Sequence, residues 1–117
     1  MTLPKKVKIG HMEYAVSLDQ KLLSGTSYLS STEYAYFDSW EKKIGLNPQM
    51  PSEMQASEFL HEIFHGLFFT TGLTRTYGNY PAQHEEEIVT HLSRGLCTVF
   101  KDNPKLLDYF KEAICAE

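Results

Sequence analysis

The segment from Ser52 to Gly72 constrains the fold of this chain more than any other part of the sequence. Its apolar residues recur at the three- and four-residue spacing of one face of an α-helix. They are Ala56, Phe59, Leu60, Ile63, Phe64, Leu67 and Phe68. Ser52 and Gln55 match a capping box at the helix start, and Gly72 is suited to end the helix. The pattern therefore predicts a long helix that buries one face against other elements.

The half of the chain before this helix indicates short strands. Residues 5–18 alternate loosely between apolar and polar side chains around the dipeptide Gly10-His11, which predicts a hairpin. The other segments of this half are a strand at 33–38, a strand at 43–47 and, at 19–32, a short helical turn with a loop.

The half of the chain after the first helix indicates two more helices. One runs from about His84 to Phe100, with its apolar face centred on Leu92, Leu96 and Val99. The sequence Asp-Asn-Pro at 102–104 ends it, and a last helix at about 105–113 follows. That helix is expected to pack through Leu106, Leu107, Tyr109, Phe110 and Ile114. Strands followed by helices predict an α+β fold in a single domain over residues 1–117.

Composition excludes several classes of protein. The net charge of −4 argues against a nucleic-acid partner, because such proteins carry a basic surface. No apolar run approaches the roughly 18 residues of a membrane span, and the N-terminus lacks the apolar core of a signal peptide. The two cysteines do not make a disulfide framework, so we expect a cytoplasmic protein.

The motif HEIFH at 61–65 lies within the predicted long helix. Residues four apart on an α-helix are rotated by only about 40°, so His61 and His65 point the same way. Two imidazoles in this arrangement can bind one Zn²⁺. Glu62 lies on the flank, where it can act as a general base toward water that the metal activates.

A catalytic zinc site needs a third protein ligand, and an acidic cluster at the start of the next helix can supply it. Glu85, Glu86 and Glu87 form this cluster, which also complements the helix macrodipole. Measured from the expected apolar face of this helix, Glu85 lies near the centre and Glu86 at the edge. Helical angles alone therefore favour Glu85 or Glu86 as the ligand.

HEIFH followed by EEIVTHLSRGL resembles the minimal gluzincin-type metallopeptidases of the ImmA/IrrE kind, and related small zincin-like proteins of phages and prophages. In that pattern the third ligand begins a register of the form E-x-x-A-x-x-F-A-x-x-L-L. Starting the register at Glu85 would put His91 and Gly95 in packing positions, which fits worse than starting it at Glu86. The resemblance therefore implies that His61, His65 and Glu86 bind zinc, with Glu85 in reserve.

The resemblance also implies a fold and a way to bind substrate. A small twisted sheet, antiparallel or mixed, would pack on the helix that carries HEIFH. An edge strand beside the cleft would hold an extended peptide by strand addition, and the segment KIGLN at 43–47 is the candidate.

Two functions compete. The first is a zinc-dependent peptidase that cleaves a protein or peptide substrate, with Glu62 as general base. The alternative is a non-catalytic zinc-binding phage or prophage protein that binds a host or phage regulatory protein. A site closed by a fourth ligand such as His84 would favour the alternative. Tyr77 and Tyr80 can stabilise an oxyanion or simply pack at the rim.

Overall fold

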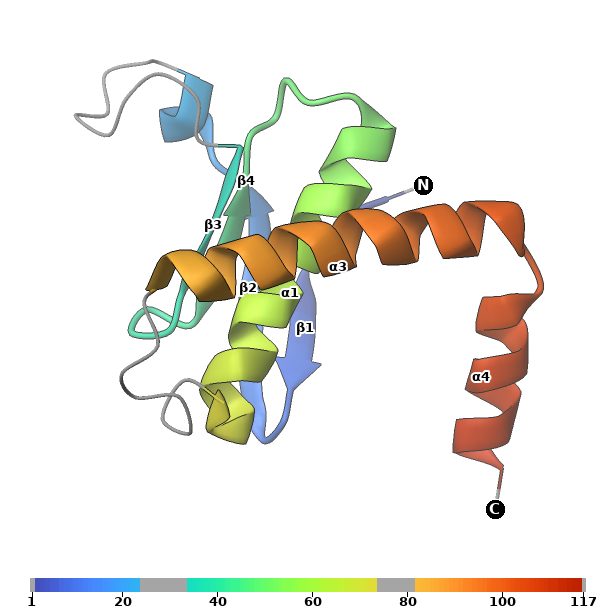
Figure 1. Cartoon of the computed structure of the whole chain (residues 1–117). Coiled ribbons are helices and arrows are strands. Elements are labelled where there is room, and N and C mark those ends of the chain that lie inside the picture. Colours follow the sequence, from blue (N-terminus) through green and yellow to red (C-terminus); the bar gives the residue numbers. More distant parts are fainter. Residues whose placement is uncertain (1, 24–33, 74–81, 117) are drawn as a thin grey trace.

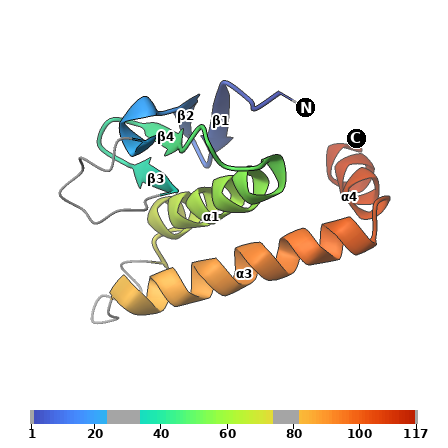
Figure 2. The same cartoon turned by 90° about the horizontal axis from the view of Figure 1, so that it is seen from above.

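The computed structural model describes residues 2–23, 34–73 and 82–116, and these residues form an α+β fold. Strands β1 (Lys6–Ile9), β2 (Met12–Leu18), β3 (Ala35–Asp38) and β4 (Lys43–Leu46) build a four-stranded mixed sheet (Figure 1). A short 3₁₀ helix, η1 (Gln20–Leu23), follows β2. In the described residues three α-helices come after the sheet, in the order that the sequence patterns predict. In Figure 2 the sheet, α1 and α3 lie in successive layers, with α1 in the middle.

The strands lie in the order β1-β2-β4-β3. The β1–β2 and β3–β4 pairs are antiparallel, whereas β2 and β4 are parallel. The hairpin prediction is confirmed, with Gly10 in the turn at a φ of 64°. The prediction that 43–47 forms the edge strand is wrong. β4 is buried along most of its length and has a partner on each side, so β1 and β3 are the edges among the described strands.

Helix α1 (Ser52–Thr71) crosses the sheet. It ends at Gly72, which has the predicted left-handed conformation with a φ of 82°. The capping-box prediction is wrong, because Pro51 occupies the N-cap position and no side chain caps the helix. Ser52 is therefore already the first helical residue, and the backbone carbonyl of Pro51 accepts a hydrogen bond from the Gln55 N–H at 2.8 Å.

The main core lies between α1 and the sheet. Its buried centre is the cluster Ile9, Tyr14, Val16 and Ile44, against which Phe37, Phe59 and Ile63 pack. Gly66 lets α1 approach this cluster closely. A Cβ atom at Gly66 would lie 2.7 Å from Ile9 Cδ1 and 3.1 Å from Phe37 Cε1. The absence of a side chain at this position therefore sets the depth of the helix that carries both histidines.

We expect Gly66→Ala to be about 1–3 kcal/mol less stable than Gly95→Ala, because overpacking a core position typically costs that much. Gly95 is the matched control, since it is also within a helix and a Cβ there would meet no atom within 4 Å. Alanine replaces glycine favourably in an open helix position by about 1 kcal/mol. Urea denaturation of both variants measures the difference. Equal stabilities would show that the close approach at Gly66 is not required.

Helix α3 (Ala82–Asp102) packs on the face of α1 opposite the sheet. Val89 and Ser93 are its buried residues, with exposed fractions of 0% and 1%. The prediction of a face centred on Leu92, Leu96 and Val99 is wrong, since Leu92 is 51% exposed and Val99 is 42% exposed. A contact face predicted only from the positions of apolar residues leaves out serine. The small side chain of Ser93 nevertheless lets α3 approach α1 closely.

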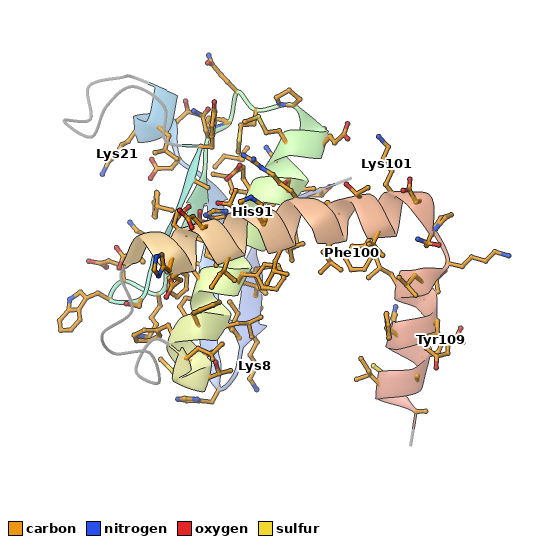
Figure 3. All side chains as sticks on the ribbon, in the orientation of Figure 1. Lys8, Lys21, His91, Phe100, Lys101 and Tyr109 are labelled. Atoms are coloured by element: carbon orange, nitrogen blue, oxygen red, sulfur yellow. The ribbon has the colours of Figure 1, made fainter. Side chains whose placement is uncertain are left out.

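Helix α4 (Leu106–Cys115) has no buried residue. Leu107, Tyr109, Phe110 and Ile114 are exposed, so the prediction that this helix packs through them is wrong. The chain turns at 103–105 after α3 ends, as predicted, and α4 then folds back to the side of α3 on which α1 lies, laterally separated from α1 and the sheet (Figures 1 and 2). Figure 3 shows Tyr109 on the side of α4 that points away from the sheet. In the described residues, none of the helices has the length and apolar character needed to cross a membrane.

Candidate metal centre

Helix α1 holds two histidines against each other. His61 and His65 lie one helical turn apart, and their Nε2 atoms are 3.2 Å apart. The ring centroids are 4.8 Å apart and the rings meet edge to face. The prediction that the four-residue spacing turns both imidazoles to the same side is therefore confirmed. His61 is buried and His65 is half-buried, so both rings are largely shielded from bulk water.

Helix α3 brings Glu86 to both imidazoles. Glu86 Oε1 lies 2.8 Å from His61 Nε2, and Glu86 Oε2 lies 2.9 Å from His65 Nε2. The three side chains offer ligand atoms that all lie within 4.8 Å of one another, which is the arrangement of a possible metal site. Glu86 is thus the acid that the two helices bring between the histidines.

Glu85 contacts a different atom. Its Oε2 lies 2.7 Å from Nδ1 of His65, on the other side of that ring. A carboxylate in this position can accept a hydrogen bond from Nδ1–H, which selects the tautomer whose Nε2 carries a lone pair, the form of histidine that binds metals. The two acids that helical angles could not separate therefore contact opposite nitrogens of the same imidazole. Glu85 orients His65, whereas Glu86 converges with it.

The spacing of this cluster is compatible with a bound metal ion. A tetrahedral zinc ion with nitrogen and oxygen ligands at about 2.0–2.1 Å holds those ligand atoms about 3.3 Å apart. The distances between the Nε2 atoms and the nearest Glu86 oxygens, and between the two Nε2 atoms, run from 2.8 to 3.2 Å. Acceptor atoms this close are stabilised by a cation among them. His61, His65 and Glu86 therefore form a group that could hold a metal ion, and two imidazoles with one carboxylate are a donor set that zinc accepts.

The environment of His61 favours metal binding as well. Burial lowers the pKa of its imidazole below the usual 6.5, and the nearby Glu86 carboxylate partly opposes this shift. A lowered pKa keeps the ring neutral at pH 7. Because metals bind the neutral imidazole, protons compete less with a metal ion for His61 than they would for an exposed histidine.

A third acid near the two histidines, Glu62, comes from α1 itself. Its side chain is buried, with 6% of the residue exposed, and its Oε2 lies 3.8 Å from His61 Nε2. A carboxylate at this depth is costly to ionise unless its surroundings compensate. Its position beside the candidate ligands, rather than among them, agrees with the predicted flanking placement.

A cavity of about 510 Å³ opens onto these residues. Besides His61, Glu62, His65 and Glu86, it is lined by Tyr34, Ala35, Met54, Glu58, Thr90, Ser93 and Arg94. Sequence analysis did not select any of these seven as site residues. A signal was present only on α3, where Thr90 and Arg94 follow Glu86 at four and eight residues. No sequence signal could have shown that Ala35, at the start of β3, lies beside the cavity.

The remaining candidates do not enter the cluster. His84 lies in the first turn of α3 and is not part of the group formed by His61, His65 and Glu86. His91, labelled in Figure 3, lies on the exposed side of α3 and its Nδ1 is 2.8 Å from the Glu87 carbonyl oxygen. Tyr77 and Tyr80 lie outside the described residues.

Comparisons of this chain with protein-family models, with curated proteins and with solved structures found no match.

Proposed function

We propose that this protein is a zinc-dependent metallopeptidase that hydrolyses peptide bonds in a protein substrate. One observation carries the proposal. Two imidazole Nε2 atoms and the Glu86 carboxylate converge within metal-binding distance, and the buried Glu62 lies beside them in an open cavity. This arrangement agrees with the resemblance of HEIFH and EEIVTHLSRGL to ImmA/IrrE-type metallopeptidases.

Each residue of the cluster has a distinct task in this proposal. His61, His65 and Glu86 would hold the ion, and Glu85 would keep His65 in the right tautomer and orientation. When bound, zinc polarises a carbonyl and makes water a stronger acid. Glu62 takes a proton from the attacking water and then donates it to the amine that leaves as the peptide bond breaks.

The number of ligands favours catalysis over a structural zinc site. A structural site usually has four protein ligands, whereas a catalytic site keeps one position open. In the described residues the cluster contains three, and His84 is not among them. A purely structural site has no need of Glu62, so burying that carboxylate next to the ligands supports the enzyme. The alternative of a non-catalytic protein that binds a host or phage regulator lacks a comparable observation.

The substrate is held as an extended strand in this proposal. β3 is the last strand of the sheet and pairs only with β4 among the described strands. Ala35 lies at its start and lines the cavity, as does Tyr34 just before it. A peptide that added to the outer side of β3 would therefore pass next to the candidate metal centre. Edge strand β3 replaces the 43–47 segment as the proposed binding strand.

The protein acts in the cytoplasm in this proposal, and belongs to the phage or prophage-associated group that the resemblance implies. Both cysteines, Cys97 and Cys115, are free thiols, which suits a reducing compartment.

Metal analysis and a proteolysis assay test the proposal together. Protein purified without added zinc is expected to contain about one zinc ion per chain, and to cleave denatured casein or a mixed peptide library in a way that a chelator stops and zinc restores. Bound zinc without cleavage of any peptide would favour the non-catalytic alternative. Failure to bind zinc, even after soaking, would exclude both.

A further inference from the structure

Arg94 lines the same cavity as the candidate metal centre. We propose that its guanidinium binds a carboxylate group of the peptide substrate and so determines which peptides are cleaved. This inference rests on the proposed peptidase function, because it assigns the substrate class of the same site. The carboxylate is either the C-terminus of the peptide or an aspartate or glutamate side chain, since both present the same pair of oxygens to arginine.

The charges around the cavity single out this arginine. Among the described residues that line it, Arg94 is the only lysine or arginine, and the acids are Glu58, Glu62 and Glu86. Both carboxylate oxygens of Glu86 contact the two histidines. No ion pair within 4.0 Å joins Arg94 to any carboxylate of the described residues. Its planar group of N–H donors is therefore available to a ligand.

Lys101 is a second cation of α3 and serves as a comparison, because it does not line the cavity. It lies two turns further along the helix, near its end in Figure 3, and its Nζ is 3.4 Å from Glu53 Oε1. Both side chains of that pair are mostly exposed to water. Both cations of α3 are exposed residues, but Lys101 has an acidic partner outside the cavity, whereas Arg94 lines the cavity and, in the described residues, has no carboxylate within 4.0 Å.

Helix geometry limits how far the recognised carboxylate lies from the bond that is cleaved. Arg94 follows Glu86 by eight residues, which corresponds to about 12 Å along the axis of α3. An extended peptide advances about 3.3 Å per residue. The carboxylate is therefore expected within about four residues of the scissile bond.

Binding measurements test the inference without relying on cleavage. The protein is the full chain carrying Glu62→Gln, loaded with zinc in one series and metal-free in another. The probes are fluorescein-labelled eight-residue peptides of glycine, serine and alanine. They contain one Asp or Asn at each position in turn, and each is made with a free or an amidated C-terminus. Fluorescence anisotropy reports their affinity.

We expect at least one acidic probe to bind about ten- to a hundredfold more tightly than its neutral counterpart, as hydrogen bonds to charged groups typically give. Arg94→Gln should abolish this preference, and Arg94→Lys should retain part of it. Lys101→Gln, the matched loss of a positive charge from the same helix, should leave it unchanged. Glu58→Gln should strengthen binding of the acidic probe, because it removes a negative charge from the cavity.

The probes distinguish the two sources of the carboxylate. A difference between free and amidated peptides identifies the C-terminus, and a difference between Asp and Asn identifies a side chain. An Arg94-dependent preference, combined with no cleavage by the protein that keeps Glu62, would uphold the carboxylate site and reject the peptidase. No preference in the Glu62→Gln protein that keeps Arg94, or a preference that survives the further change Arg94→Gln with unchanged thermal unfolding, would overturn the inference.

Discussion

Glu62→Gln is expected to lower the rate of peptide hydrolysis by about 10²–10⁴-fold, the usual contribution of a general acid–base residue. Zinc affinity should change little, because His61, His65 and Glu86 provide the converging ligand atoms and Glu62 lies beside them. Glutamine keeps the size of the side chain but cannot take a proton. Initial rates of peptide cleavage and a zinc titration on the same preparation measure the two effects separately.

The matched control for this variant is Glu53→Gln. Glu53 is an acid on the same helix, but its side chain is 85% exposed and pairs with Lys101 outside the cavity. We expect the Glu53→Gln protein to cleave at the rate of the parent. A Glu62→Gln protein that cleaves as fast as the parent would contradict the assignment of the general base.

The second large effect is expected at Glu86. Replacing it by Gln removes the negative charge that lies between the two Nε2 atoms, so zinc affinity should fall by more than about 100-fold. Glu85→Gln should cost less, about 10–100-fold, the range for a carboxylate that orients a metal-binding histidine. Competition titrations against a zinc-binding dye give both affinities at one pH.

Glu87→Gln completes this series, because it removes the third acid of the same cluster. Glu87 is exposed, and in the described residues it is not part of the candidate metal group. The zinc affinity of the Glu87→Gln protein should equal that of the parent. If Glu85→Gln proved more damaging than Glu86→Gln, the two acids would have to exchange roles, and the proposed ligand set would be wrong.

Local periodicity was enough to predict half of the site. The spacing of His61 and His65 depends only on the pitch of one helix, and apolar patterning predicted that helix. Glu62 follows from the same argument. His61, Glu62 and His65 belong to one helix, so the helical backbone of residues 61–65 determines their relative positions.

The other half of the site depends on how two helices meet. Helical angles left Glu85 and Glu86 open, because the apolar residues of α3 placed its contact face near Leu92. The actual contact is made through Val89 and Ser93, which turns Glu86 toward both Nε2 atoms. The register E-x-x-A-x-x-F-A-x-x-L-L, started at Glu86, puts Val89 and Ser93 at its two small-residue positions, so the resemblance implies the ligand Glu86 where helical angles leave two choices.

Long-range pairing explains the remaining errors. The sequence at 43–47 is equally suitable for an edge or a central strand, and only the parallel pairing of β4 with β2 puts it inside the sheet. In the same way, the pattern of α4 predicts an apolar face but cannot say whether another surface lies opposite. A single arginine such as Arg94 carries no local signal in the sequence, because its proposed role depends on the cavity that it lines.

The amino-acid sequence by itself determined the α+β order of elements, the hairpin, the long helix and the shared orientation of His61 and His65. These properties arise from backbone conformation and side-chain period over short distances. Only the tertiary structure decided which strand is an edge, which acid meets the histidines and which side chains line the cavity. Those outcomes depend on the packing of segments distant in the chain, where the fit of small residues such as Ser93 and Gly66 sets how closely elements approach.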